Sequence, residues 1–149
     1  MAGSSFLMKA TVRIARPADF GRIVAAYSAW GYSGGMTLVD TAWLAEADDE
    51  LIGVVRVAPE NGTLVLRGMR IAEDWRRRGI GTRMLRELAA WLGHRECYCI
   101  PYDHLVGFYG QIGFAEIATG AVPAFLAARL ADYRKRRGLR VSIMVRGAA

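Results

Sequence analysis

The chain has 149 residues, of which 53% are apolar and 23% are charged, and its formal net charge is +6. This balance excludes a generally disordered protein, and the length suits one domain around one core, spanning residues 1–149. Residues 1–11 contain one lysine and no long apolar run, which excludes a signal peptide and a membrane span in that segment.

The first predicted elements are a strand and a helix. Val12 and Ile14 share one face of residues 10–16, which indicates a short strand. Pro17 then opens a helix, and Gly31 provides a left-handed stop for it. The apolar stripe of this helix consists of Phe20, Ile23, Val24 and Tyr27.

Three antiparallel strands are predicted next. Residues 43–47 and 51–58 form a hairpin around an acidic turn, and Asn61-Gly62 favours a primed turn into a third strand at 63–72. Gly68 interrupts this third strand. A glycine inside a strand commonly marks a bulge or a place where a ligand comes close to the backbone.

The second half of the chain alternates helices and strands, so the sequence predicts a mixed α/β domain. A helix with one apolar face begins near Ile80 and ends at Gly93. The remaining predicted elements are a strand at 96–100, a short helix at 105–111, a strand at 114–117, a helix at 123–137 and a strand at 141–145.

A basic turn at 71–82 is the strongest candidate for a binding site. Three consecutive arginines, 76–78, precede Gly79 and Gly81 at the start of a helix. The unpaired N–H groups and the positive end of the helix dipole attract an anion, and the glycines let a phosphate approach the backbone. The turn therefore predicts an anion site, with a tight turn carrying solvated arginines as the alternative.

Two motifs together resemble the GNAT acetyltransferases. Arg76-x-x-Gly79-x-Gly81, between a strand and an amphipathic helix, is similar to the loop that binds the pyrophosphate of acetyl-CoA in this family. Further along, residues 108–114 (FYGQIGF) resemble the family's helix with a catalytic tyrosine followed by Gly-Phe. The resemblance covers nearly the whole chain and implies the GNAT fold, a mixed and mostly antiparallel central sheet flanked by helices.

The resemblance also implies which residues bind acetyl-CoA, the cosubstrate. The residues implied around the pyrophosphate are Arg76, Arg77, Arg78, Gly79, Ile80, Gly81 and Thr82. Met69, Arg70 and Ile71 are implied to pair with the pantetheine arm like an added strand, and a bulge N–H to polarise the thioester carbonyl. Tyr102 stands where many relatives carry an asparagine that contacts the pantetheine, so this contact is not expected here.

The activity implied by the resemblance is N-acetyl transfer, in which an amine attacks the thioester directly. Tyr109 is the implied catalytic residue, donating a hydrogen bond or proton to the departing CoA thiolate. A tyrosine of the core with a carbonyl partner is the alternative. No general base is evident, and Glu73, His104 and water all remain open.

The acceptor is expected to be a primary amine of a small molecule, peptide or protein. The resemblance places its entry near residues 27–36, where Trp30, Tyr32 and Trp43 either form an aromatic wall or pack ordinarily. Arg67 and Arg70 could bind a carboxylate, as in an amino acid or a peptide end. A homodimer remains open, whereas neither nucleic acid nor a membrane is an expected partner.

The two cysteines, Cys97 and Cys99, lie in a predicted strand. We expect their side chains to point to opposite faces and form no disulfide. They lack partners at metal-binding spacing, so no metal site is expected, and a reducing, cytoplasmic setting fits best. The basic cluster at 134–137 is expected to be a solvated surface. A non-enzymatic acyl-CoA-binding regulatory module is the main alternative to an enzyme, because no base can be named.

Overall fold

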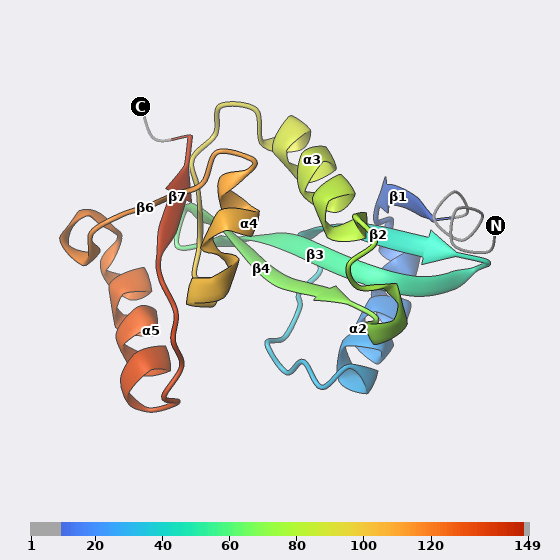
Figure 1. Cartoon of the computed structure of the whole chain (residues 1–149), viewed down its shortest axis with the longest axis horizontal. Helices are drawn as coiled ribbons and strands as arrows, with labels where there is room; N and C mark the ends of the chain where they lie inside the picture. The colour runs from blue at the N-terminus through green and yellow to red at the C-terminus, as the bar shows by residue number, and fades with distance from the viewer. Residues whose placement is uncertain (1–9, 148–149) are drawn as a thin grey trace.

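The computed structural model describes residues 10–147 and consists of one sheet with helices on both faces (Figure 1). The prediction that residues 1–11 are not a signal peptide falls mainly on residues 1–9, which lie outside the described residues. None of the helices within the described part combines the length and the apolar character needed to cross a bilayer.

Seven strands form the sheet in the order β1-β2-β3-β4-β5-β7-β6. The strands are β1 (Thr11–Ile14), β2 (Thr41–Ala47), β3 (Glu50–Glu60), β4 (Thr63–Ile71), β5 (Cys97–Cys99), β6 (Ala115–Glu116) and β7 (Met144–Arg146). Neighbouring strands are antiparallel except for β4 and β5, which run parallel. The predicted mixed, mostly antiparallel sheet is thus confirmed.

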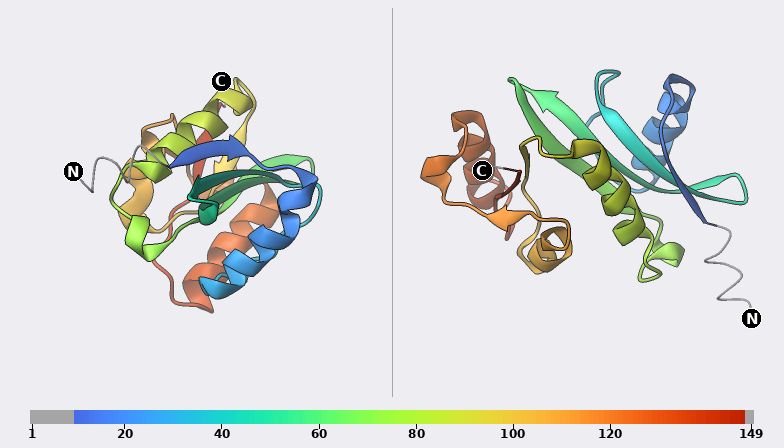
Figure 2. Two further views of the ribbon diagram at one scale, coloured as in Figure 1. Left: turned by 90° about the vertical axis from the view of Figure 1, so that its right-hand side faces the viewer. Right: turned by 90° about the horizontal axis from the view of Figure 1, so that it is seen from above.

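The helices cover both faces of this sheet. The helices are α2 (Phe20–Ala29), α3 (Ile80–Leu92), α4 (Val106–Gly110) and α5 (Ala124–Lys135), with short 3-10 turns η1 (Pro17–Asp19), η2 (Glu73–Trp75), η3 (Asp103–Leu105) and η4 (Thr119–Ala121). Figure 2 shows α2 and α5 on one face and α3 on the other. Figure 1 shows that α5 and α2 lie near opposite ends of the long axis.

Strand alternation explains how the core divides between the two faces. Val54 of β3 packs with α2, and Val65 of β4 packs with α5. Their neighbours Val55 and Leu66 point the other way and pack with α3 and Tyr109 of α4. Because successive strand residues face opposite sides, each central strand serves two cores at once.

The last strand was predicted at residues 141–145. In the structure it is shorter and begins three residues further along the sequence, since β7 comprises Met144–Arg146. The preceding main chain makes other bonds: Ser142 N donates to Pro101 O (2.9 Å), and Ile143 O accepts from Ile117 N (3.1 Å). Val141 forms only an isolated bridge with Tyr102. Periodicity alone cannot distinguish such a bridging segment from a regular strand.

The prediction that Cys97 and Cys99 face opposite sides is wrong. Both side chains are buried in the cluster beneath α3, whereas Tyr98 between them packs against α5. Residues two apart in a strand share a face, so this arrangement follows from strand geometry. Both cysteines are free thiols. Burial raises the pKa of Cys97 to about 12 and that of Cys99 well above its usual value.

Candidate active site

The sheet opens between β4 and β5. These strands pair only at Leu64–Cys97 and Val65–Tyr98, after which β5 ends at Cys99 and the chain turns away at Pro101. Within residues 10–147, the edge of β4 beyond Val65 therefore has no strand beside it on this side. A strand edge without a neighbouring strand can pair with an extended ligand. On this segment Met69 O and Ile71 O each also accept a hydrogen bond from an arginine side chain, that of Arg70 and that of Arg76.

The predicted bulge lies at Gly68. Arg67 pairs with Arg56 and Arg70 with Val54, so Gly68 and Met69 together oppose the single residue Val55. Gly68 has a φ of 68°, and a Cβ there would overlap the Arg56 guanidinium and the Tyr27 hydroxyl. The Tyr27 hydroxyl donates to the Gly68 carbonyl at 2.8 Å. Only glycine suits this position, as expected for a bulge residue in the left-handed region.

The bulge also decides where two arginines point. Arg67 and Arg70 are three residues apart and would face opposite sides of a regular strand. Because the bulge adds one residue, Arg67 lies opposite Arg56 and Arg70 opposite Val54, two residues that share the face covered by α2. Both guanidinium groups therefore belong to the side of the sheet that carries α2 and α5.

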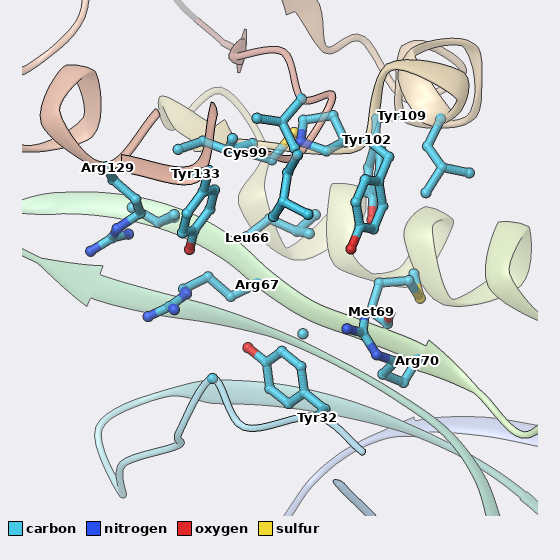
Figure 3. A pocket seen from close by; sticks show the side chains of 18 of the residues that line it. Tyr32, Leu66, Arg67, Met69, Arg70, Cys99, Tyr102, Tyr109, Arg129 and Tyr133 are labelled. Atoms are coloured by element: carbon cyan, nitrogen blue, oxygen red, sulfur yellow. Dashed lines mark hydrogen bonds between the residues drawn. The ribbon is translucent and has the colours of Figure 1, made fainter. Parts of the chain in front are cut away.

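A cavity of about 370 Å³ occupies this opening on the side of α5. Figure 3 shows arginines and tyrosines from several elements around it. Its walls come from the 31–34 loop, β4, the 99–102 turn, α4 and α5. The polar side chains among its lining residues are Tyr32, Ser33, Arg67, Arg70, Tyr102, Tyr109, Arg129, Tyr133 and Arg137. No carboxylate or imidazole from residues 10–147 lines the cavity.

Tyr109 of α4 lines this cavity. Its ring packs edge-on against Phe108 and Phe114, with centroid separations of 5.1 and 6.2 Å. No residue in the described part of the chain forms a hydrogen bond with its hydroxyl, although 95% of the residue's surface is buried. Burial is the main cause that raises the pKa of Tyr109 well above its usual value, and the neighbouring Cys99 raises it further. The phenol is thus protonated and free to donate.

The turn before α3 has the features of an anion site. Gly79, the N-cap residue, has a φ of 80°, and Arg77 also lies in the left-handed region at 62°. No side chain caps the helix, and its first internal bond is from Arg83 N to Gly79 O. The N–H groups of Ile80, Gly81 and Thr82 are therefore left without intrahelical acceptors. Nothing lies within 4 Å of a Cβ placed on Gly79, so the approach is open.

The arginines of this turn hold the loop in place. Arg76 Nε donates to Ile71 O, and Arg78 Nε donates to Asp74 O, each at 3.0 Å. These bonds tie the loop to the end of β4 and to η2. Packing also favours glycine at position 81, in addition to the predicted approach of a phosphate, because a Cβ there would lie 3.0 Å from Phe108 Cζ. The anion site is consequently built from main chain more than from charge.

The two side chains considered as general bases are Glu73 and His104. Glu73, in η2, lines a separate depression near Asp74 and Trp75. His104, in η3, is exposed and stacks on Tyr102 at 5.8 Å between centroids. Neither residue lines the cavity.

Of the two alternatives for the aromatic residues, ordinary packing applies to Trp43 and Trp30. Tyr32 lines the cavity, but Trp43 is buried beneath α3 and packs edge-on against Trp91 at 5.3 Å. Trp30 packs beside α2 in a different cluster. Trp43 points away because its position in β2 alternates with those of the residues facing α2.

Sequence reasoning overlooked several residues of the site. Arg56, buried in β3, contacts the loop that walls the cavity, and its signal was one charge inside an apolar strand. Arg129 and Tyr133 lie four residues apart on α5, which places them on one helical face. Arg137, expected on a solvated surface, also lines the cavity, with its guanidinium 5.3 Å from the Tyr133 ring centroid.

The open edge of β4 leads through the 72–79 turn to the uncapped start of α3, and Tyr109 lines the cavity beside that edge. Residues 19–114 match the family model described as the Acetyltransferase (GNAT) family, and the chain belongs to this family. No curated protein matches the sequence significantly.

Solved structures share the fold. N-acetylglutamate synthase from Neisseria gonorrhoeae, complexed with coenzyme A and N-acetyl-glutamate, has 18% identity over 92% of this chain and a TM-score of 0.63. This chain spans only 34% of that protein. Rv2747 from Mycobacterium tuberculosis, solved with CoA, has 20% identity, a TM-score of 0.68 and coverage of 93% and 99% of the two chains. Escherichia coli ElaA has 15% identity and a TM-score of 0.67, and the match covers 92% of this chain and 99% of ElaA.

Proposed function

We propose that residues 1–149 form a single-domain N-acetyltransferase that transfers the acetyl group of acetyl-CoA to a primary amine. The observation that carries this proposal is the meeting of three features at one opening: the free edge of β4, the bulge at Gly68 and the unpartnered hydroxyl of Tyr109. The free thiols of Cys97 and Cys99 favour a reducing, cytoplasmic location.

Two parts of the chain fit the carrier. The main-chain N–H groups at Ile80, Gly81 and Thr82, preceded by the 76–79 turn, suit its pyrophosphate, because they have no internal acceptors and face open space at Gly79. The edge of β4 at 69–71 suits the amide groups of its pantetheine arm, which can pair with a strand edge. Acetyl-CoA would supply an acetyl group activated as a thioester.

The bulge and Tyr109 would act on the two atoms that gain negative charge when an amine attacks a thioester directly. A main-chain N–H of the bulge at Gly68 and Met69 is proposed to donate to the carbonyl oxygen. Tyr109 is proposed to donate to the leaving sulfur. Its raised pKa favours a hydrogen bond over full proton transfer, since a thiol is normally more acidic than this phenol.

Water is the proposed acceptor of the proton that the amine loses. Neither Glu73 nor His104 lines the cavity, and no other carboxylate or imidazole from residues 10–147 does so. The same observation favours a second candidate, a non-enzymatic module that binds acyl-CoA and does not turn it over.

One experiment separates the two candidates. Calorimetric titration with acetyl-CoA tests binding, and release of free CoA thiol in the presence of an amine library tests transfer. The enzyme requires both signals, whereas binding without thiol release for any amine favours the regulatory module. No binding heat would contradict both.

A further inference from the structure

The cavity contains a marked excess of positive charge. Arg67 and Arg70 enter it from β4, and Arg129 and Arg137 enter it from α5 and the residues just after that helix. Glu60, at the end of β3, is the carboxylate that pairs with two of them. Its Oε2 lies 3.4 Å from Arg67 Nη1, and its Oε1 accepts from Arg129 Nη2.

This single carboxylate leaves donors unsatisfied. Arg129 Nη1 is buried and has no hydrogen-bond partner within the described residues. Arg70 and Arg137 have no carboxylate within salt-bridge distance in residues 10–147. Unpaired guanidinium groups lining a cavity favour an anionic ligand, which can form charge-assisted, bidentate hydrogen bonds with them.

Arg70 is the best placed of these cations. Its Nη1 donates to Met69 O at 2.9 Å, and its guanidinium lies 4.7 Å from the ring centroid of Tyr32. The Tyr32 hydroxyl in turn accepts from Arg56 Nη1 at 3.0 Å. These contacts fix the plane of the guanidinium and use one of its five N–H groups, so the others can bind an anion.

Arg70 also lies close to the proposed reaction centre. Its Nη1 donates to the carbonyl oxygen of the bulge residue Met69 at 2.9 Å, so the guanidinium itself contacts the bulge. Its charge acts on the hydroxyl of Tyr109, opposing the rise in pKa that burial and Cys99 cause there. An anionic group held by Arg70 would therefore lie within a few bonds of an amine positioned at the bulge.

Taking the proposed N-acetyltransferase activity as the basis, we propose that the acceptor is an amino acid whose carboxylate is bound by Arg70. An α-amino acid separates its amine from its carboxylate by one carbon, which matches the short separation between Arg70 and the bulge. The side chain of the acceptor extends towards Arg67 and Arg129, which line the cavity and offer donors. Polyamines are disfavoured by the surrounding cations.

The test compares matched acceptors in the intact protein. Thiol release is measured with the common L-amino acids, with their amides and with the amines left when the carboxylate is removed. We expect kcat/KM for the preferred amino acid to exceed that for its decarboxylated counterpart at least about tenfold, because a charged hydrogen-bonded pair is lost. Arg70→Met should raise KM for the amino acid and largely remove this preference.

Two controls make the outcome decisive. Arg86→Met removes an exposed arginine of α3 and should leave the preference intact. Calorimetric affinity for CoA reports whether Arg70→Met still folds and binds the carrier. If amines are acetylated but wild type does not distinguish amino acids from their decarboxylated counterparts, the carboxylate site is wrong and the activity stands. If CoA binds and no amine is acetylated, the proposed function itself fails, and this inference with it.

Discussion

Arg56 and Asp40 form a buried ion pair between the middle of β3 and the loop that walls the cavity. Arg56 Nε lies 2.9 Å from Asp40 Oδ2, and the two side chains are 1% and 5% exposed. The same guanidinium donates to the Tyr32 hydroxyl and, at 3.4 Å, to Gly34 O. One side chain thus holds the loop at three places, and through Tyr32 it supports Arg70.

Loss of one partner of this pair should destabilise the fold. Arg56→Met leaves Asp40 buried without its cation, and we expect the free energy of unfolding to fall by about 3–5 kcal/mol. Replacing both residues, as Arg56→Met with Asp40→Leu, should recover part of this loss. Urea unfolding of the two single variants and the double variant measures the coupling. Additive losses in the double variant would show that the pair does not act as a unit.

Tyr109→Phe should slow catalysis without weakening the protein. We expect kcat to fall by about 10- to 100-fold, because a hydrogen bond to the negatively charged leaving sulfur is lost. CoA affinity and the free energy of unfolding should change little, since the hydroxyl bonds to no described residue. Steady-state kinetics, calorimetry and urea unfolding provide the three readouts. An unchanged kcat would remove Tyr109 from the mechanism.

Gly81 has two roles that a double variant can separate. The change in unfolding free energy caused by Gly81→Ala should be less favourable in wild type than in the Phe108→Leu background, because the added Cβ would lie 3.0 Å from Phe108 Cζ. Gly81→Asp should weaken CoA binding by placing an anion and a side chain at the helix start. If the phosphate site is correct, this loss of affinity persists in the Phe108→Leu background. Recovery of affinity there would assign Gly81 to packing alone.

The pH dependence of the rate should follow the acceptor. Since no base of the described residues lines the cavity, kcat/KM should rise with pH up to the pKa of the acceptor amine. The raised pKa of Tyr109 keeps its donor form present throughout this range. pH profiles with amines of different basicity check this. An apparent pKa near that of histidine that stays constant across acceptors would point to His104 instead.

Alkaline pH should destabilise the fold. Burial raises the pKa of Cys97 and of Tyr27 to about 12 in each case, so the folded state keeps protons that the unfolded chain releases at lower pH. Their contribution to stability is complete below the ordinary pKa values of these groups and declines as pH rises from about 9 to 12. Urea unfolding across this range should show a falling free energy. A flat profile would contradict the burial of these groups.

Local patterns were sufficient to predict the bulge and the turn before α3. Gly68 interrupts a strand, and the 76–81 motif follows that strand directly, so both signals lie within a short stretch of sequence. The side-by-side arrangement of β2, β3 and β4 followed from their hairpin turns. The error over Cys97 and Cys99 came from applying that alternation incorrectly.

The cavity depended on contacts between distant segments, which no local pattern reveals. Glu60 pairs with Arg129 across 69 residues of sequence, and Tyr27 reaches Gly68 across 41. The role of Arg56 could not be predicted for the same reason, because its partner Asp40 lies in an irregular loop. The choice between an aromatic wall and ordinary packing for Trp43 stayed open in the sequence, because the face of β2 on which it lies is decided by the register with β3.

Hydrogen–deuterium exchange with and without CoA tests the central claim most directly, because the binding site is proposed to consist mainly of main-chain amides. We predict that CoA slows exchange at two places, the edge of β4 beyond Val65 and the first turn of α3, and leaves β1 and β2 unchanged. Protection confined to other segments, or no change at saturating CoA, would contradict the account.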